Sequence, residues 1–144
     1  MDEPLAVSIL RMKVGWGDCD AAGITYYARY FDWFCDARFK LLNDYNLKYT
    51  KWFHPNDLHL VVLETGCDYK NIIRPEETIL VETALISVSR SRAQFNYHVK
   101  KNNTQLAASG FTKHAYVDLE GNPCNIEKYN PELWKKISQT FLKS

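Results

Sequence analysis

Residues 15–27 read GWGDCDAAGITYY and lead directly into an aromatic-rich segment. Two aspartates, Asp18 and Asp20, stand two positions apart and are bracketed by glycines. The residues after Asp20 are small and apolar, which is unlike an exposed loop. Such a stretch could bind a cation or a phosphate, could turn the chain and cap a helix, or could hold a carboxylate beside a buried cavity.

Two ligand-binding loops are excluded by the residues at fixed positions. An EF-hand loop that began at Asp18 would need an acid at its fifth position and glutamate at its twelfth, where this chain has Ala22 and Arg29. The dinucleotide pattern G-x-G-x-x-G fails at its third glycine, where Asp20 would repel a pyrophosphate. Two interpretations remain open: a capping turn in which Gly23 takes a positive φ, and a catalytic carboxylate.

The segment after this stretch has the periodicity of one long helix. From Ala28 onward apolar side chains recur at steps of three, four and seven, and charged side chains occupy the other side. The apolar positions are Phe31, Phe34, Leu41 and Tyr45, and the charged ones are Arg29, Asp32, Asp36 and Lys40. So many aromatic residues predict a helix that is largely covered by other elements.

Strand-like segments flank this helix. Residues 5–14 predict a first strand, and a loop around HPND (54–57) precedes four more, at 58–73, 79–88, 93–99 and 105–118. Consecutive strands joined by short turns predict an antiparallel sheet, and therefore an α+β fold. A last helix is predicted by Asn130 as its cap and Pro131 at its first position, with an apolar stripe of Leu133, Trp134, Ile137 and Phe141.

Composition indicates an ordinary globular protein of one domain, 1–144. Hydrophobic residues make up 46% and charged residues 24% of the 144 residues, and the net charge of +1 gives no basic field for nucleic acid. No apolar run has transmembrane length and the first residues do not resemble a signal peptide, so we expect a cytoplasmic protein. Neither the scattered cysteines (Cys19, Cys35, Cys67 and Cys124) nor the histidines (His54, His59, His98 and His114) have metal-site spacing. We expect no metal and no cofactor.

The stretch GDCDAAGITYYARYFDW (17–33) closely resembles the active-site segment of the 4-hydroxybenzoyl-CoA thioesterase family. The family pattern has an acid, any residue, Asp, two small residues, Gly, two aliphatic-type positions and an aromatic pair; here it runs from Asp18 to Tyr27. The resemblance extends to IIRPEETILVET (72–83), which is similar to the proline-containing turn between the family's second and third strands. It implies the hotdog fold, in which a five-stranded antiparallel sheet wraps around the long helix, and thioesterase activity.

The resemblance assigns three catalytic roles. Asp20 would attack the thioester carbonyl as a nucleophile or activate a water molecule as a general base. The backbone N–H of Tyr27 would stabilise the oxyanion, and Gly23 would allow the close approach; the Tyr27 ring could at the same time pack in the core. Asp18 is expected to hold the loop. A helix starting just after Asp20 would favour its ionised form and tilt the mechanism towards direct attack.

The resemblance places coenzyme A contacts in the turn that follows residue 88. There the predicted contacts with the nucleotide are Ser89, Arg90, Ser91 and Arg92, because arginine suits phosphate by its fork geometry. A solvated hairpin is the alternative, and Lys70 and Arg74 are weaker candidates. Cys35 stands where relatives carry an aspartate that meets the phenol, which argues against a hydroxybenzoyl substrate. The aromatic residues Tyr49, Trp52 and Phe53 could line an acyl pocket or could form a packed loop.

The expected protein is therefore an acyl-CoA thioesterase that assembles as a homodimer or as a dimer-of-dimers tetramer, since one helix leaves the other sheet face and the sheet edges uncovered. An acyl-carrier-protein thioester is an alternative substrate. A dehydratase or hydratase on the same fold would use an acid–base pair that typically includes histidine, and none lies near the motif. A non-catalytic acyl-binding module would not require Asp20.

Overall fold

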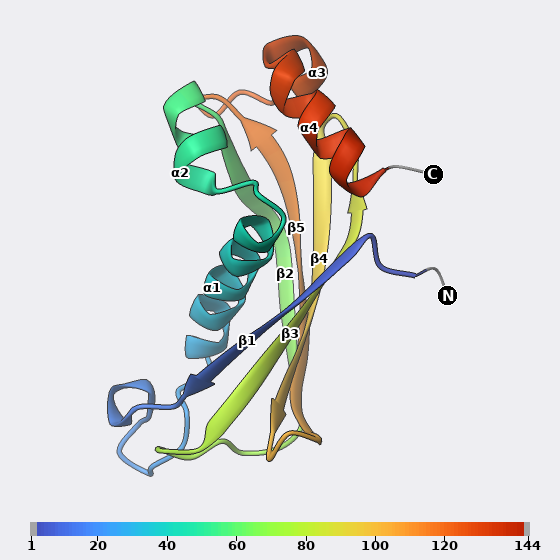
Figure 1. Cartoon of the computed structure of the whole chain (residues 1–144). Coiled ribbons are helices and arrows are strands. Elements are labelled where there is room, and N and C mark those ends of the chain that lie inside the picture. Colours follow the sequence, from blue (N-terminus) through green and yellow to red (C-terminus); the bar gives the residue numbers. More distant parts are fainter. Residues whose placement is uncertain (1–2, 143–144) are drawn as a thin grey trace.

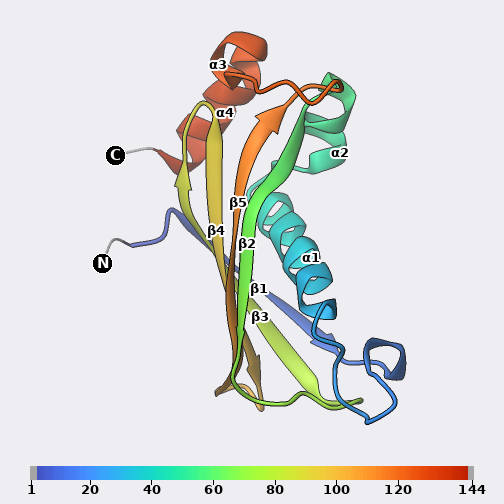
Figure 2. The same ribbon diagram turned by 180° about the vertical axis from the view of Figure 1, so that it is seen from behind.

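A computed structural model describes residues 3–142. Its five strands form one antiparallel sheet in the order β1-β3-β4-β5-β2, as Figures 1 and 2 show from opposite sides. The strands are β1 (Ala6–Lys13), β2 (His59–Tyr69), β3 (Thr78–Val88), β4 (Arg92–Lys101) and β5 (Gln105–Val117). The predicted α+β class and all five predicted strands are confirmed.

Helix α1 (Arg29–Asp44) lies along one face of the sheet (Figures 1 and 2). Phe34 stacks on Tyr97 of β4, with ring centroids 4.4 Å apart and planes 9° apart. A Cβ on Gly110 of β5 would lie 2.6 Å from the Phe34 ring, so only glycine lets helix and sheet approach this closely. This contact forms the centre of the core.

The buried face of α1 is rotated from the predicted one. Phe34 and Leu41 are buried as expected, but Phe31 and Tyr45 are only half-buried. The buried positions are Tyr30, Trp33, Phe34, Ala37, Arg38, Leu41 and Leu42. The prediction missed Arg38 because its partner is on the sheet: its Nη1 donates a hydrogen bond to the Tyr97 hydroxyl over 3.1 Å.

The segment between α1 and β2 contains two short helices that the sequence analysis did not predict, α2 (Tyr49–Trp52) and the 3₁₀ turn η2 (His54–Asn56). Phe53 is buried, and the Tyr49 ring stacks on it at 5.0 Å with an 8° interplanar angle. The Lys136 amine lies 5.1 Å from the Trp52 ring centroid. These contacts show a packed loop, and the lining of an acyl pocket by these aromatic residues stays a prediction.

The C-terminal segment folds as α3 (Ile126–Tyr129) and α4 (Pro131–Phe141) at the upper end of the sheet in Figure 1. The side chain of Asn130 accepts a hydrogen bond from the Leu133 N–H over 3.2 Å, which confirms the predicted cap. Of the predicted apolar stripe, Leu133, Ile137 and Phe141 are buried and Trp134 is half-buried. No helix within residues 3–142 is long and apolar enough to cross a membrane.

Strand β2 is one edge of the sheet, because it pairs with β5 alone. It exposes three consecutive apolar residues, Val61, Val62 and Leu63, at 37%, 48% and 48% of their surface. A long edge strand of this kind offers unpaired backbone groups and apolar side chains to another strand.

Candidate active site

The segment that follows β1 folds back on itself as a small hairpin. The Asp20 N–H donates to the Ile24 carbonyl and the Tyr26 N–H donates to the Asp18 carbonyl, each over 2.9 Å. Gly23 turns the chain with φ of +71°, as predicted for a residue that must adopt a left-handed conformation. The Thr25 N–H and hydroxyl both donate to the Ile73 carbonyl, over 3.0 and 2.9 Å, and so attach the hairpin to the segment after β2.

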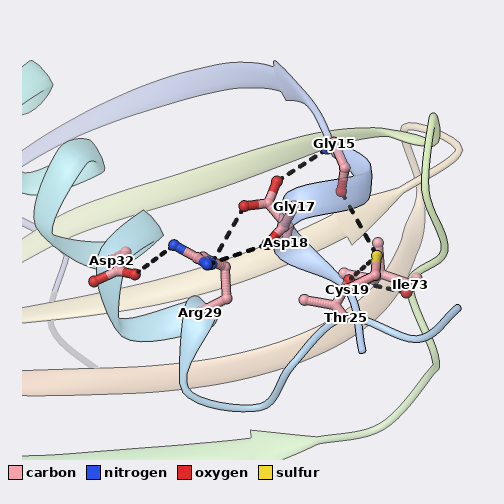
Figure 3. A network of polar contacts seen from close by, with 8 residues as sticks. All are labelled: Gly15, Gly17, Asp18, Cys19, Thr25, Arg29, Asp32 and Ile73. Atoms are coloured by element: carbon pink, nitrogen blue, oxygen red, sulfur yellow. Dashed lines mark hydrogen bonds and ion pairs between the residues drawn. The ribbon is translucent and has the colours of Figure 1, made fainter. Parts of the chain in front are cut away.

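Asp18 holds this hairpin against the start of α1, as Figure 3 shows. Its Oδ2 accepts from the Gly15 N–H over 2.9 Å, and its Oδ1 lies 3.3 Å from Arg29 Nε. Arg29 also pairs with Asp32 over 3.3 Å and donates to the Gly17 carbonyl over 3.2 Å. The expected loop-holding role of Asp18 is confirmed by these contacts.

Asp20 is fixed through one of its two carboxylate oxygens. Oδ1 accepts from the N–H groups of Ala22 and Ile24 over 2.9 and 3.3 Å. Oδ2 has no hydrogen-bond partner within residues 3–142. The backbone therefore sets the orientation of the carboxylate and leaves its second oxygen available for chemistry.

Two details of the surroundings of Asp20 differ from expectation. Its side chain is exposed in the single chain, whereas the apolar sequence after it suggested a buried cavity. Helix α1 begins at Arg29, nine residues later, so the donors that contact the carboxylate belong to the hairpin turn and not to the helix N-terminus. The helix-dipole argument for direct attack consequently has no support in this geometry.

Tyr27 presents a backbone N–H that forms no hydrogen bond within the described part of the chain. Its carbonyl accepts from the Tyr69 hydroxyl over 2.8 Å. The residue is 62% exposed, so its ring does not pack in the core of the single chain. An unpaired, fixed N–H at the start of a helix is the kind of donor that an oxyanion needs.

A cavity of about 270 Å³ lies beside the hairpin. It is lined by the hairpin, the start of α1 and the end of β2, through Ile24, Thr25, Tyr27, Tyr30, Tyr69, Lys70, Asn71 and Ile72. Asp20 is not one of the lining residues, but its Oδ1 accepts from the N–H of Ile24, which lines the cavity. The cavity is mostly aromatic and aliphatic, and the hairpin that carries Asp20 forms one of its sides.

Sequence reasoning missed two tyrosines of this cavity, Tyr30 and Tyr69. Their rings meet edge to face, with centroids 4.9 Å apart. Burial raises the pKa of Tyr30 to about 12 and raises the pKa of Tyr69 above its ordinary value, so both hydroxyls stay protonated at neutral pH. The sequence contains one signal for Tyr69. The alternation of side chains along β2 places Cys67 and Tyr69 on the same face of the sheet.

The predicted coenzyme A residues lie at the other end of the sheet, in the β3–β4 turn (Figure 1). The Ser89 hydroxyl accepts from the N–H groups of Ser91 and Arg92 over 3.3 and 3.1 Å and so shapes the turn. Arg90 Nε pairs with Glu127 over 2.7 Å, and its guanidinium lies 5.1 Å from the Trp134 ring. Within residues 3–142 the exposed side chain of Arg92 has no ion pair.

Lys70 and Arg74, the weaker candidates for contacts with coenzyme A, lie elsewhere in the fold. Lys70 lines the cavity, but its amine pairs with Asp68 over 2.8 Å. Arg74 is exposed in the turn before β3. Because the hairpin and the β3–β4 turn occupy opposite ends of one sheet, a single chain does not bring Asp20 and Arg92 together.

The chain belongs to the thioesterase-like superfamily, whose match spans residues 14–137. It is similar to the acyl-CoA thioesterase YbgC of Haemophilus influenzae, with 29% identity over 108 residues, which are 75% of this chain and 79% of that protein. Among solved structures it resembles the DHNA-CoA thioesterase from Staphylococcus aureus, with a TM-score of 0.86, 22% identity and coverage of 92% of this chain and 89% of that chain. A hypothetical protein from Aquifex aeolicus has a TM-score of 0.78 and 29% identity, covering 88% and 98% of the two chains.

These findings confirm the predicted family, the hotdog fold and the class of enzyme, a thioester hydrolase. The acyl group and the catalytic roles of Asp20, Gly23 and Tyr27 stay predictions, as do the contacts of Ser89, Arg90, Ser91 and Arg92 with coenzyme A.

Proposed function

We propose that the protein hydrolyses acyl-CoA thioesters to the free acid and coenzyme A, with Asp20 as the catalytic carboxylate. One observation carries this proposal: backbone donors hold Asp20 through Oδ1 alone, and one of them, Ile24, lines the same cavity as Tyr27, whose N–H has no partner within residues 3–142. A turn aspartate with a purely structural role would not require the other two features.

The chemistry follows one of two routes. In the first, Asp20 Oδ2 attacks the thioester carbonyl, the C–S bond breaks, the coenzyme A thiolate leaves, and water then hydrolyses the mixed anhydride. In the second, Asp20 takes a proton from a water molecule as the water oxygen attacks the same carbonyl, and the C–S bond then breaks to release the free acid and the coenzyme A thiolate. Both routes pass through a tetrahedral oxyanion, and the Tyr27 N–H is the donor that stabilises it.

The working unit is a homodimer in which two β2 strands pair across a twofold axis. The support is the edge position of β2 and its exposed apolar residues Val61, Val62 and Leu63. Antiparallel pairing would continue the sheet through both chains and cover these side chains. The outer sheet face, where Val7, Ile9 and Ile86 are exposed, offers the second surface that a dimer of dimers needs.

This dimer also supplies a site for the nucleotide of coenzyme A. Antiparallel pairing turns one chain end for end relative to its partner, so the β3–β4 turn of one chain lies at the same end as the Asp20 hairpin of the other. Arg92 is the better phosphate ligand of the two arginines, because Arg90 is already paired with Glu127. Ser89, Ser91 and Arg90 complete the turn that presents Arg92.

The acyl group is aromatic or of medium chain length, and it does not depend on a phenol. Cys35, half-buried on α1, offers no strong acceptor for a hydroxyl. An apolar site gains only about 1–3 kcal/mol per methylene, whereas a site built to bind a hydroxyl discriminates far more strongly. The cavity beside Tyr27 is mostly aromatic and aliphatic, so it fits an apolar site without strong selection for a hydroxyl.

A panel of four thioesters tests the proposal. We expect the wild-type protein to hydrolyse benzoyl-, phenylacetyl- or medium-chain acyl-CoA with a kcat/KM at least equal to that for 4-hydroxybenzoyl-CoA. Release of free thiol, followed with a colorimetric reagent, gives all four values. Hydrolysis of none of the four would overturn the proposed function. A preference for 4-hydroxybenzoyl-CoA by orders of magnitude would overturn the pocket assignment and point to Asp36, the next residue on α1.

A further inference from the structure

Tyr69, at the end of β2, contacts Tyr27, whose N–H is the proposed oxyanion donor. None of the catalytic roles proposed above includes this contact. Its hydroxyl donates a 2.8 Å hydrogen bond to the carbonyl of Tyr27. In a regular helix that carbonyl would accept from the Phe31 N–H. Here the Phe31 N–H donates to the Ala28 carbonyl over 3.2 Å, so α1 leaves the Tyr27 carbonyl to a side chain from the sheet.

This contact completes a pair of restraints on the Tyr27 backbone. On the preceding side, the Tyr26 N–H is held by the Asp18 carbonyl over 2.9 Å. On the following side, the Tyr27 carbonyl is held by Tyr69. The N–H of Tyr27 lies between these restraints, and the Tyr26 carbonyl, which shares its peptide plane, is also held, by the Arg29 N–H over 2.9 Å. Rotation about the φ or ψ of Tyr27 would break the contact with Tyr69. Preorganised donors of this kind stabilise developing charge without a cost of reorganisation during the reaction.

The Tyr69 side chain is itself firmly placed. Its ring packs edge to face on Tyr30, which is 4% exposed, at a centroid distance of 4.9 Å and an angle of 84°. Its position on β2 is in register with the buried Ala108 of β5, so the ring points to the inner face of the sheet. The hydroxyl can therefore fix the Tyr27 carbonyl in one orientation.

We propose that Tyr69 is a positioning residue, whose hydroxyl sets the Tyr27 N–H in the direction of the thioester oxyanion. This inference rests on the proposed thioesterase function and adds a residue to it. Tyr69 acts through Tyr27 and has no part in the attack on the carbonyl. Because an oxyanion forms only in the transition state, losing the orientation should lower kcat and leave substrate binding nearly unchanged.

The Tyr69→Phe variant removes this hydroxyl and keeps the ring. The chain offers a matched control, Tyr129→Phe, because Tyr129 is also 43% exposed and its hydroxyl also donates to backbone carbonyls, those of Asn56 and Asp57 over 3.2 and 3.4 Å. The control contact lies in the loop before β2 and is not part of the cavity. Melting temperatures of both variants report any general loss of stability.

We expect Tyr69→Phe to lose kcat by at least about tenfold, with KM within about twofold of wild type, since removing an oxyanion donor outright costs about 10²–10³ in kcat. Tyr129→Phe should keep wild-type kinetics. The proposal is overturned if Tyr69→Phe retains kcat within about twofold, if its main effect is on KM, or if Tyr129→Phe loses as much activity. A wild-type protein that hydrolyses no acyl-CoA would instead overturn the proposed function, so the two failures are distinguishable.

Discussion

At the scale of single residues, Asp18 and Asp20 show how two identical side chains acquire different surroundings. Both oxygens of Asp18 are engaged, one by the Gly15 N–H and one by Arg29. Asp20 is engaged through Oδ1 only. The resemblance predicted a loop-holding role for Asp18 and a catalytic role for Asp20, while the spacing alone was compatible with two turn aspartates. What it could not predict is the partner of each oxygen, since Arg29 reaches Asp18 across a folded hairpin.

His114, on β5, is a single residue with a measurable effect on stability. It is fully buried, and its Nε2 lies 2.7 Å from the Thr112 hydroxyl. Burial, together with the nearby Arg38 guanidinium, lowers the pKa of His114 from 6.5 to about 3. The imidazole is therefore neutral in the native state across the physiological range.

The lowered pKa of His114 predicts that the stability of the protein depends on pH. Between pH 6.5 and 3 the unfolded chain binds a proton at His114 that the native state does not bind, so the free energy of unfolding falls as pH falls through this window. One such proton contributes a slope of up to about 1.4 kcal/mol per pH unit. Urea unfolding at pH 4, 5 and 6 should show a shallower slope for His114→Gln than for wild type. His98→Gln, at an exposed position on β4, is the control, and parallel curves for His114→Gln and wild type would contradict the account.

At the scale of elements, the periodicity of apolar residues predicted which strands and helices form and which strand face is buried. The alternation at 93–99 matches the buried positions Ala93, Phe95, Tyr97 and Val99 of β4, because one face of that strand meets α1. The apolar positions of α1 did not determine which side of the helix is buried. Arg38 is buried because Tyr97 accepts its hydrogen bond, and that partner lies 59 positions away.

Elements too short to show a repeating pattern of apolar residues were not predicted. The four-residue helices α2 and α3 are too short to show an amphipathic stripe. Tyr69 was missed as a site residue for a related reason, since its contact with Tyr27 spans 42 positions. The hairpin that carries Asp20 was predicted only as a turn, because its attachment to the Ile73 carbonyl is likewise tertiary.

At the scale of the whole molecule, the proposed site needs two chains. The segment between β1 and α1, which carries Asp20, lies at one end of the sheet, and the β3–β4 turn, which leads into Arg92, lies at the other (Figure 1). Pairing of two β2 edges would bring the Asp20 hairpin of one chain and the Arg92 turn of its partner to the same end of a continuous sheet. Each dimer would then hold two sites, and each site would take residues from both chains.

Mixing two defective variants tests this sharing. Alone, Asp20→Asn should be inactive, and Arg92→Ala should be active only at a raised KM, since phosphate contacts stabilise substrate and transition state alike. Co-refolded in equal amounts, they should recover low-KM activity at about a quarter of the wild-type level, because half of the dimers are mixed and each mixed dimer has one intact site. If the mixture shows only the high-KM activity of Arg92→Ala, each site is built from a single chain.

The most direct test of the central claim is the steady-state rate of Asp20→Asn on the best acyl-CoA substrate. The substitution keeps the size of the side chain and the acceptor oxygen that Ala22 and Ile24 contact, so the variant should fold and melt like wild type. Asparagine neither attacks the thioester nor takes a proton from water, so we expect kcat to fall by orders of magnitude. A folded Asp20→Asn protein with kcat within a few-fold of wild type would contradict the account.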